Sequence, residues 1–479
     1  MKNILIAIRS IFKKGRHNVM KIVSLGIGLA VGLVLIAKVY FEQSYDDFYP
    51  DRDRVYQVWA KYQQNGGELK DYPQTSGGIA PTMQQQIPEI ETVTRYTSFG
   101  DWTFTMTDTK MKYSGRCIIA DSCFFDILPR PMLIGNAKEV LSTPMYVLIS
   151  SRIAKNIGGD VIGEKFTGDS SPGRTMTIGG VFEEVPENSH SRYDVIVSMA
   201  SAGRFMWEGS PTNMLGNDRY ISYVKLHKGV NPLALEEQVH TFVNSYFPPE
   251  EQQKTGFNIG FSFHELDGLH KELPQVKRMT WILSLLAFAL IFTAVMNYIL
   301  IVISSIVNRS KEVAVHKCYG ASENNIHGMM FGEALVHIVL SLILALLLIL
   351  AFRGTVEELL ATSLDSLLLS NGSLVLLGIC ILVFFVSGFM PGSLYARIPV
   401  ASAFRNYREN KRIWKKALLL VQFVATGFLV TMLVFVARQY TFMVNDRPGY
   451  AYENLAYCGL AGVDSTSRAK ILDEVMRLP

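Results

Sequence analysis

The chain of 479 residues has few cysteines and no short motif of a catalytic site. Five cysteines are too few for a disulfide framework, although a bridge between Cys117 and Cys123 stays open. The patterns G-x-S-x-G, H-E-x-x-H and C-x-x-C are absent, and the histidines lack the spacing of metal ligands. Residues 158–165 (GGDVIGEK) have the glycine spacing of a phosphate loop without its Gly-Lys pair, so they predict a turn. The sequence therefore predicts a non-catalytic chain without a cofactor or metal site.

Long apolar runs are the main positive feature of the sequence. A transmembrane helix needs about 20 mainly apolar residues to cross the hydrocarbon core. Five runs meet this requirement: 22–40, 279–306, 334–352, 374–391 and 417–437. The first run lacks a small-residue cleavage site and is followed by interfacial aromatic residues, so it predicts a retained anchor rather than a signal peptide.

The distribution of Lys and Arg next to these runs predicts their orientation. Residues 1–21 carry six basic residues and no acidic one, and residues 397–416 carry seven basic residues against Glu409. Both segments are therefore expected in the cytoplasm, the first as an amphipathic N-terminal segment and the second as a linker. The sequence predicts a multi-pass plasma (inner) membrane protein with a cytoplasmic N-terminus and residues 41–278 outside.

The net charge of +4 is concentrated in these juxtamembrane clusters. Topology and attraction to the anionic lipid bilayer explain such clusters without a nucleic-acid partner. Hydrophobic residues make up 49% of the chain, the upper edge of globular usage, because a large soluble domain dilutes the spans.

Residues 41–278 are long enough to fold around a core of their own. Alternating or β-rich segments predict strands at 54–62, 92–107, 113–119, 144–149 and 176–181. Helical patterns appear at 78–87, 150–156 and 233–246. We therefore expect an α-helical membrane protein with a large extracytoplasmic α+β domain between its first two transmembrane helices.

Small and polar residues inside the predicted spans indicate helix packing. Gly28 and Gly32 form a G-x-x-x-G pattern that permits close helix approach, although glycine is also common in membrane helices. Asn297 and His337 are isolated polar residues, which predict hydrogen bonds between helices rather than a transport path.

A short charged stretch follows the second span and ends at a Gly-Ala pair. On charge alone it is a solvated juxtamembrane helix that obeys the positive-inside rule. The acidic residue among the basic ones, the interleaved apolar residues and the Gly-Ala stop favour an amphipathic helix that seats in a partner's groove. The residues expected to make this seat are Arg309, Lys311, Glu312, Val315, Lys317, Gly320, Ala321, Ser322 and Ile326.

The same stretch resembles the R-x-K/R-E-I-G/A-V-R-K-A-L-G-A-S segment of the FtsX/MacB family of ABC transporter permeases. His316, Cys318 and Tyr319 depart from the commonest residues, whereas most charges and the Gly-Ala pair are kept. Residues 120–128 and 178–186 resemble segments of the outer domain in that family, which is a MacB-like periplasmic core domain. Residues 279–396 would then be the FtsX-like permease domain, so the resemblance covers nearly the whole chain.

This resemblance implies a permease subunit that works with a separate cytoplasmic ABC ATPase. In the family, the segment after the second span seats on the ATPase, and the outer domain makes a mechanical stroke for export, efflux or lipoprotein and cell-envelope work. A homodimer or heterodimer with another permease, and a periplasmic adaptor, are further implied partners. A membrane-anchored sensor or scaffold without transport activity is the alternative, although its expected cytoplasmic signalling domain is not apparent.

The chain also contains an internal repeat. Residues 7–9, a basic stretch, a span and residues 45–51 resemble residues 403–405, a basic stretch, the fifth span and residues 440–448. Residues 438–479 are therefore expected to begin a second extracytoplasmic domain that is incomplete, and the chain to be a truncated duplicated form.

Overall fold

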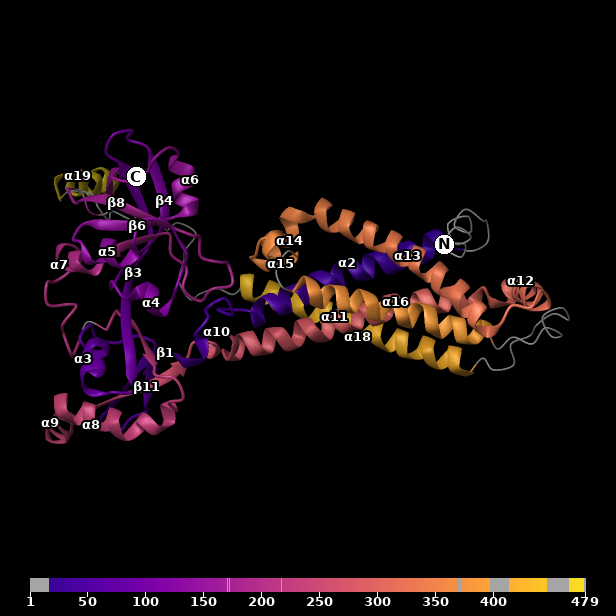
Figure 1. The fold of residues 1–479 in the computed structure, drawn as a ribbon, viewed down its shortest axis with the longest axis horizontal. Coiled ribbons are helices and arrows are strands. Elements are labelled where there is room, and N and C mark those ends of the chain that lie inside the picture. The colour runs from indigo at the N-terminus through magenta and orange to yellow at the C-terminus, as the bar shows by residue number, and fades with distance from the viewer. Residues whose placement is uncertain are drawn as a thin grey trace. The chain divides into compact units, whose positions relative to one another are not determined.

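The computed structural model describes residues 17–169, 171, 173–216, 218–368, 372–396, 413–445 and 465–477, with only the backbone described at 306–309, 394–396 and 413–415. Most of the predicted linker at 397–416 and half of the segment 438–479 lie outside the described residues. The chain divides into two compact units (Figure 1). The span unit comprises Met1–Gln43 and Pro274–Glu453, and the α+β unit comprises Ser44–Leu273 and Asn454–Pro479.

Within the described residues, the span unit has five helices that are long and apolar enough to cross a membrane. They are α2 (Asn18–Gln43), α11 (Pro274–Ser304), α13 (Glu323–Ala351), α16 (Ser373–Ala396) and α18 (Ile413–Asn445). Each contains one of the five predicted apolar runs, except that the runs 279–306 and 334–352 extend slightly past the ends of α11 and α13. The shorter helices of this unit are α12 (Ile306–Cys318), α14 (Arg353–Leu360) and α15 (Leu364–Leu368).

Helix α2 packs against α11 and α13 around a shared apolar core. A Cβ atom added to Gly28 would lie 2.2 Å from the Cβ of Ala294, and one added to Gly32 would lie 2.4 Å from Ile291 Cγ1. Both glycines therefore sit where the α11 side chains leave no space for a methyl group. This close approach is what the predicted packing face requires, and its cause is steric rather than compositional.

The α+β unit contains eleven strands in one sheet within its described residues. The main path runs β11-β1-β10-β3-β4-β9-β6-β8-β5, with β2 beside β1 and with β7 beside β3 and β8. The strands are β1 (Val55–Gln64), β2 (Lys70–Tyr72), β3 (Ile90–Met106), β4 (Lys112–Ala120), β5 (Met132–Ile134), β6 (Tyr146–Ser150), β7 (Lys165–Gly168), β8 (Thr175–Phe182), β9 (Val195–Ser198), β10 (Ile221–Leu226) and β11 (Phe257–Glu265).

The long strand β3 connects two parts of this sheet (Figure 1). Its first half pairs with β10, and its second half pairs with β4 and β7. The helices of the unit are α3 (Ile79–Gln86), α4 (Phe124–Ile127), α5 (Ala137–Ser142), α6 (Ser151–Ile157), α7 (Ala202–Phe205), α8 (Glu236–Tyr246), α9 (Pro249–Thr255), α10 (Gly268–Lys271) and α19 (Ser465–Met476). The predicted α+β class is confirmed.

Most predicted elements of this unit are present with shifted ends. The helix expected at 233–246 begins as a 3-10 turn, Pro232–Leu235, and becomes α-helical at Glu236. Residues 158–164 connect α6 to β7, as the turn prediction required. Cys117 and Cys123 are free thiols, so the bridge between them that the sequence left open is not formed.

Replacement of Gly28 by Ala is expected to destabilise the span unit by about 1–3 kcal/mol, because the new methyl group has no room against α11. The matched control is Gly378→Ala in α16, where an added Cβ meets no atom within 4 Å. The free energy of unfolding of the intact chain in mixed micelles measures both changes. Equal effects of the two substitutions would contradict the packing assignment.

Candidate coupling site

The predicted seat is a separate short helix, α12, with a defined end. Gly320 has a φ of +84°, the left-handed conformation that ends many helices and that favours glycine. The amides of Gly320 and Ala321 donate to the carbonyls of Lys317 and His316 at 3.0 Å each. Ser322 then caps α13, because its hydroxyl accepts a hydrogen bond from the amide of Asn325 at 3.3 Å. The predicted helix stop is therefore present.

One face of α12 is buried in the span core and the other is exposed. Val313 and Ala314 are each 1% exposed and belong to the core cluster, as does Ile326 at the start of α13. Val315 is 43% exposed and Tyr319 is 87% exposed. Of the apolar residues expected at the seat, Ile326 therefore anchors the element within the protein, whereas Val315 is accessible to a partner.

The charged residues of the predicted seat lie at different depths. Lys311 and Ser322 are exposed, and Glu312, Lys317 and Ala321 are half-buried. The side chain of Arg309 lies outside the described residues. The exposed surface of α12 and of the turn that follows it, which we call the seat surface, includes Lys311, Val315, Tyr319 and Ser322.

The two polar residues predicted inside the spans form hydrogen bonds between helices. His337 Nδ1 of α13 lies 3.2 Å from the Tyr298 hydroxyl of α11. Asn297 of α11 accepts a hydrogen bond from the Gln422 amide of α18. The prediction of interhelical contacts is therefore confirmed.

A buried ion pair in the spans was not predicted. Lys21 Nζ of α2 lies 3.8 Å from Glu333 Oε1 of α13, and their side chains are 1% and 9% exposed. Lys21 belongs to the basic juxtamembrane cluster of residues 1–21, and Glu333 stands one residue before the predicted run 334–352. The missed signal is the spacing of Glu333, His337 and Ser341, which recur every four residues and therefore share one face of a helix.

A second buried pair lies at the other end of α2. Lys38 Nζ lies 2.7 Å from Glu42 Oε1 and donates a hydrogen bond to the Thr362 hydroxyl at 2.8 Å. Both charges of this pair belong to α2, whereas Lys21 and Glu333 join two helices. The pair Lys21–Glu333 therefore connects α2 to α13, whereas the pair Lys38–Glu42 lies within α2.

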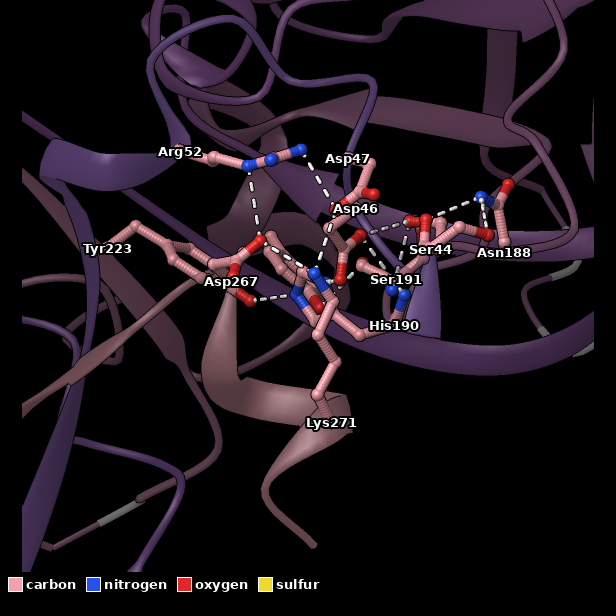
Figure 2. A network of polar contacts seen from close by, with 12 residues as sticks. Ser44, Asp46, Asp47, Arg52, Asn188, His190, Ser191, Tyr223, Asp267 and Lys271 are labelled. Carbon is pink, nitrogen blue, oxygen red and sulfur yellow. Dashed lines mark hydrogen bonds and ion pairs between the residues drawn. The ribbon is translucent and has the colours of Figure 1, made fainter. Parts of the chain in front are cut away.

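In the α+β unit, a buried polar network surrounds the segment that follows α2 (Figure 2). Asp46 is fully buried, and its carboxylate lies 2.8 Å from His190 Nδ1. His190 Nε2 lies 2.5 Å from the Tyr223 hydroxyl of β10. Burial raises the pKa of Tyr223 well above its usual value, which keeps the phenol protonated and able to donate. With Nδ1 protonated, His190 donates to Asp46 and accepts from Tyr223.

Beside this network, four charged residues join the two chain segments that lead to the spans (Figure 2). Lys271 Nζ lies 2.8 Å from carboxylate oxygens of both Asp47 and Asp267. Arg52 reaches the same two carboxylates at 2.9 and 3.1 Å. Burial lowers the pKa of Lys271, but its hydrogen bonds to the two carboxylates outweigh this effect and leave the pKa raised. The segment after α2 and the segment before α11 are therefore tied together within the α+β unit.

Asp51 extends this tie to the sheet. Its carboxylate lies 2.5 Å from Lys225 Nζ of β10 and 3.1 Å from Arg54 Nε. These hydrogen bonds lower the pKa of Asp51 from its ordinary 3.8 to about 2.

Among the described residues, no group of three His, Cys, Asp or Glu side chains is arranged to hold a metal ion.

Two family models match successive parts of the chain. Residues 20–242 match the MacB-like periplasmic core domain, and residues 284–400 match the FtsX-like permease C-terminal domain. The chain belongs to the FtsX/MacB-like ABC transporter permeases. A search of curated proteins finds no match.

Several solved structures are similar to part of this permease. A permease domain from Porphyromonas gingivalis is 32% identical, with 45% of this chain and 91% of that chain covered and a TM-score of 0.42. The periplasmic region of MacB from Actinobacillus actinomycetemcomitans is 16% identical, with 43% and 87% covered and a TM-score of 0.29. The extracellular domain of the ABC-type transporter YknZ from Gram-positive bacteria is 10% identical, with 43% and 98% covered and a TM-score of 0.30. All three TM-scores lie below 0.5, so the assignment rests on the family models.

The FtsX/MacB-like permeases are transmembrane components of ABC transporters and are generally non-catalytic. They generally work with cytoplasmic ABC ATPases. The five apolar helices and the periplasmic-domain family together indicate an inner-membrane protein.

Asp51→Asn is expected to flatten the acid dependence of stability in this permease. Because the folded pKa of Asp51 is depressed, its stabilisation is present above about pH 4 and is lost as the pH falls toward 2. The Asp51 side chain is 37% exposed, so after a discount for solvent screening the contribution is about 1 kcal/mol. Denaturant unfolding of the intact chain between pH 5 and pH 2 measures it, with Asp53→Asn as the control. Identical pH slopes for wild type and Asp51→Asn would disprove the contribution.

Proposed function

We propose that this permease seats a cytoplasmic ABC ATPase on α12 and converts ATP-driven movement into motion of its extracytoplasmic α+β unit. The observation that carries the proposal is the two-sided burial of α12. Val313 and Ala314 fix the helix in the span core, and Val315 and Tyr319 present an apolar surface on its other side. A helix held in this way passes a push on its exposed face to the spans rather than rotating freely.

The proposed orientation places α12 in the cytoplasm. Residues 1–16 and 397–412 hold dense clusters of Lys and Arg, which favours a cytoplasmic location for both segments. An odd number of spans separates these segments from the α+β unit, and α12 lies between the second and third spans. The seat surface and the α+β unit are therefore assigned to opposite sides of the membrane.

The proposed work is mechanical rather than conduction through the spans. Several buried polar side chains of the spans contact one another, as His337 contacts Tyr298 and Lys21 contacts Glu333. Such pairs satisfy the polar groups of the protein inside the hydrocarbon core without a bound solute. Export, efflux and lipoprotein or cell-envelope work all fit a stroke of the α+β unit. A second permease copy or a periplasmic adaptor fits the same scheme.

A sensor or scaffold without transport activity is the second candidate, since it would also carry an outer domain between two spans. The seat surface favours the permease because a sensor has no need for an exposed apolar helix end beside the second span. Binding of an ABC ATPase separates the two candidates.

Val315→Glu is expected to reduce co-purification of the ABC ATPase at least tenfold, because a carboxylate would be buried in an apolar contact. Leu359→Glu is the matched control, since Leu359 is 77% exposed on α14, between the third and fourth spans. Affinity purification of the tagged chain from membranes, followed by measurement of ATPase activity, reports the association. Retention of the ATPase by Val315→Glu, or its loss in both variants, would refute the seat.

A further inference from the structure

A cavity of about 650 Å³ lies beside the β1–β2 hairpin of the α+β unit. Three aromatic side chains line it, those of Tyr62 on β1, Tyr72 on β2 and Phe257 at the start of β11. The ring centroids of Tyr62 and Tyr72 are 5.5 Å apart, and those of Tyr62 and Phe257 are 5.2 Å apart. This volume lies within the range of small-molecule sites, which combine aromatic walls with a few placed polar groups.

Strand pairing explains why the three rings meet. Tyr72 of β2 pairs with Ala60 of β1, and Phe257 of β11 pairs with Gln64 of β1. Paired residues of neighbouring strands lie on one face of a sheet, as do residues two apart in one strand, so Tyr62 shares this face. Tyr62 and Phe257 also pack against the apolar core of this part of the unit. The rings therefore form a floor that the sheet holds in place.

A carboxylate without a charged partner lies beside this floor. Asp218 lines the cavity and is half-buried. Its two oxygens accept hydrogen bonds from the Tyr62 hydroxyl, at 2.7 Å, and from the Ser76 hydroxyl. Among the described residues, no Lys or Arg side chain forms an ion pair with it. Each oxygen keeps a free lone pair, so the two hydroxyls fix the position of a negative charge that a cation can still approach.

The hydrogen bond to Asp218 also acts on the ring of Tyr62. Burial and this hydrogen bond raise the pKa of Tyr62, so its phenol stays protonated and able to donate. A phenol that donates to a carboxylate carries more electron density on its ring, and this strengthens the attraction of a cation to the ring face. The rings and the carboxylate therefore favour the same kind of group, which is a positively charged one.

The rim of the cavity adds one charge of each sign, since Glu68 and Lys70 both line it and are exposed. Lys70 opposes a simple cation but can bind an anionic group on the same ligand. We propose that this cavity binds a zwitterion, with a methylated ammonium group held by the three rings and Asp218 and an anionic group held by Lys70. Methyl groups suit the aromatic floor, because a bare ammonium group is strongly hydrated and needs acceptors on several sides.

Isothermal titration calorimetry of the intact chain, in nanodiscs of phosphatidylglycerol that contain no choline, tests the proposal. Phosphocholine is the zwitterionic probe, and we expect a dissociation constant below about 1 mM. Choline lacks the anionic group and is expected to bind at least threefold more weakly. The neutral analogue of choline, in which carbon replaces nitrogen, is expected to bind at least fivefold more weakly than choline. These comparisons use the unmodified chain, so they do not depend on how variants fold.

Substitutions in the cavity assign each group its part. Tyr72→Leu and Asp218→Asn are each expected to weaken phosphocholine binding at least fivefold, because the first removes a ring and the second removes a charge. Lys70→Met is expected to weaken binding of phosphocholine but not of choline, since only phosphocholine carries an anionic group. Tyr146→Leu is the matched control and keeps wild-type binding. Tyr146 is 39% exposed, against 43% for Tyr72, and lies on β6 rather than in the cavity lining.

Vesicles of phosphatidylcholine, added as a competitor, distinguish two sources of the same chemistry. Competition with phosphocholine assigns the site to a lipid headgroup, and lack of competition assigns it to a free zwitterion. Three outcomes would overturn the proposal: no phosphocholine binding at ten times the expected dissociation constant, equal affinities for choline and its neutral analogue, or equal effects of Tyr72→Leu and Tyr146→Leu. None of these measurements involves α12 or an ABC ATPase, so the outcome is separate from that of the proposed function.

Discussion

The absence of water in the hydrocarbon core is the constraint on which the span unit depends. A polar side chain there has only protein partners, so its partner determines which helices stay together. In this chain, Lys21 and Glu333 join α2 to α13, His337 and Tyr298 join α11 to α13, and Asn297 joins α11 to α18. The arrangement of the helices therefore follows from a few polar contacts placed within an otherwise apolar core.

In the α+β unit, water competes for the charged side chains, so several contacts at once hold each charge in place. Asp47 and Asp267 share Lys271 and Arg52, and Asp51 binds Lys225 of the sheet. Single exposed ion pairs contribute little, whereas a cluster fixes the geometry of the segments that carry it. The segment that follows Ser44 is therefore tied to both the sheet and the chain that returns to α11.

The sequence predicted those features that local patterns determine. Apolar length located the spans, alternation located β1, β-rich composition located β3 and β4, and a Gly-Ala pair located the end of α12. The pair Lys21–Glu333 and the network of Asp46, His190 and Tyr223 could not be found in this way. Lys21 and Glu333 are 312 residues apart in the sequence, Asp46 and His190 are 144 apart, and His190 and Tyr223 are 33 apart. Only the fold brings them together. The burial of Ile326 was missed for the same reason, because exposure depends on neighbouring helices rather than on local sequence.

The central claim is that the seat surface and the α+β unit lie on opposite sides of the membrane. Accessibility of single cysteines to a membrane-impermeant maleimide in spheroplasts tests it most directly. Cys318, at the end of α12, is exposed, and Asp101→Cys places a thiol at a side chain that is 85% exposed in the α+β unit. If the two lie on opposite sides, position 101 is labelled in intact spheroplasts and Cys318 is labelled only after permeabilisation. Labelling of Cys318 in intact spheroplasts would contradict it.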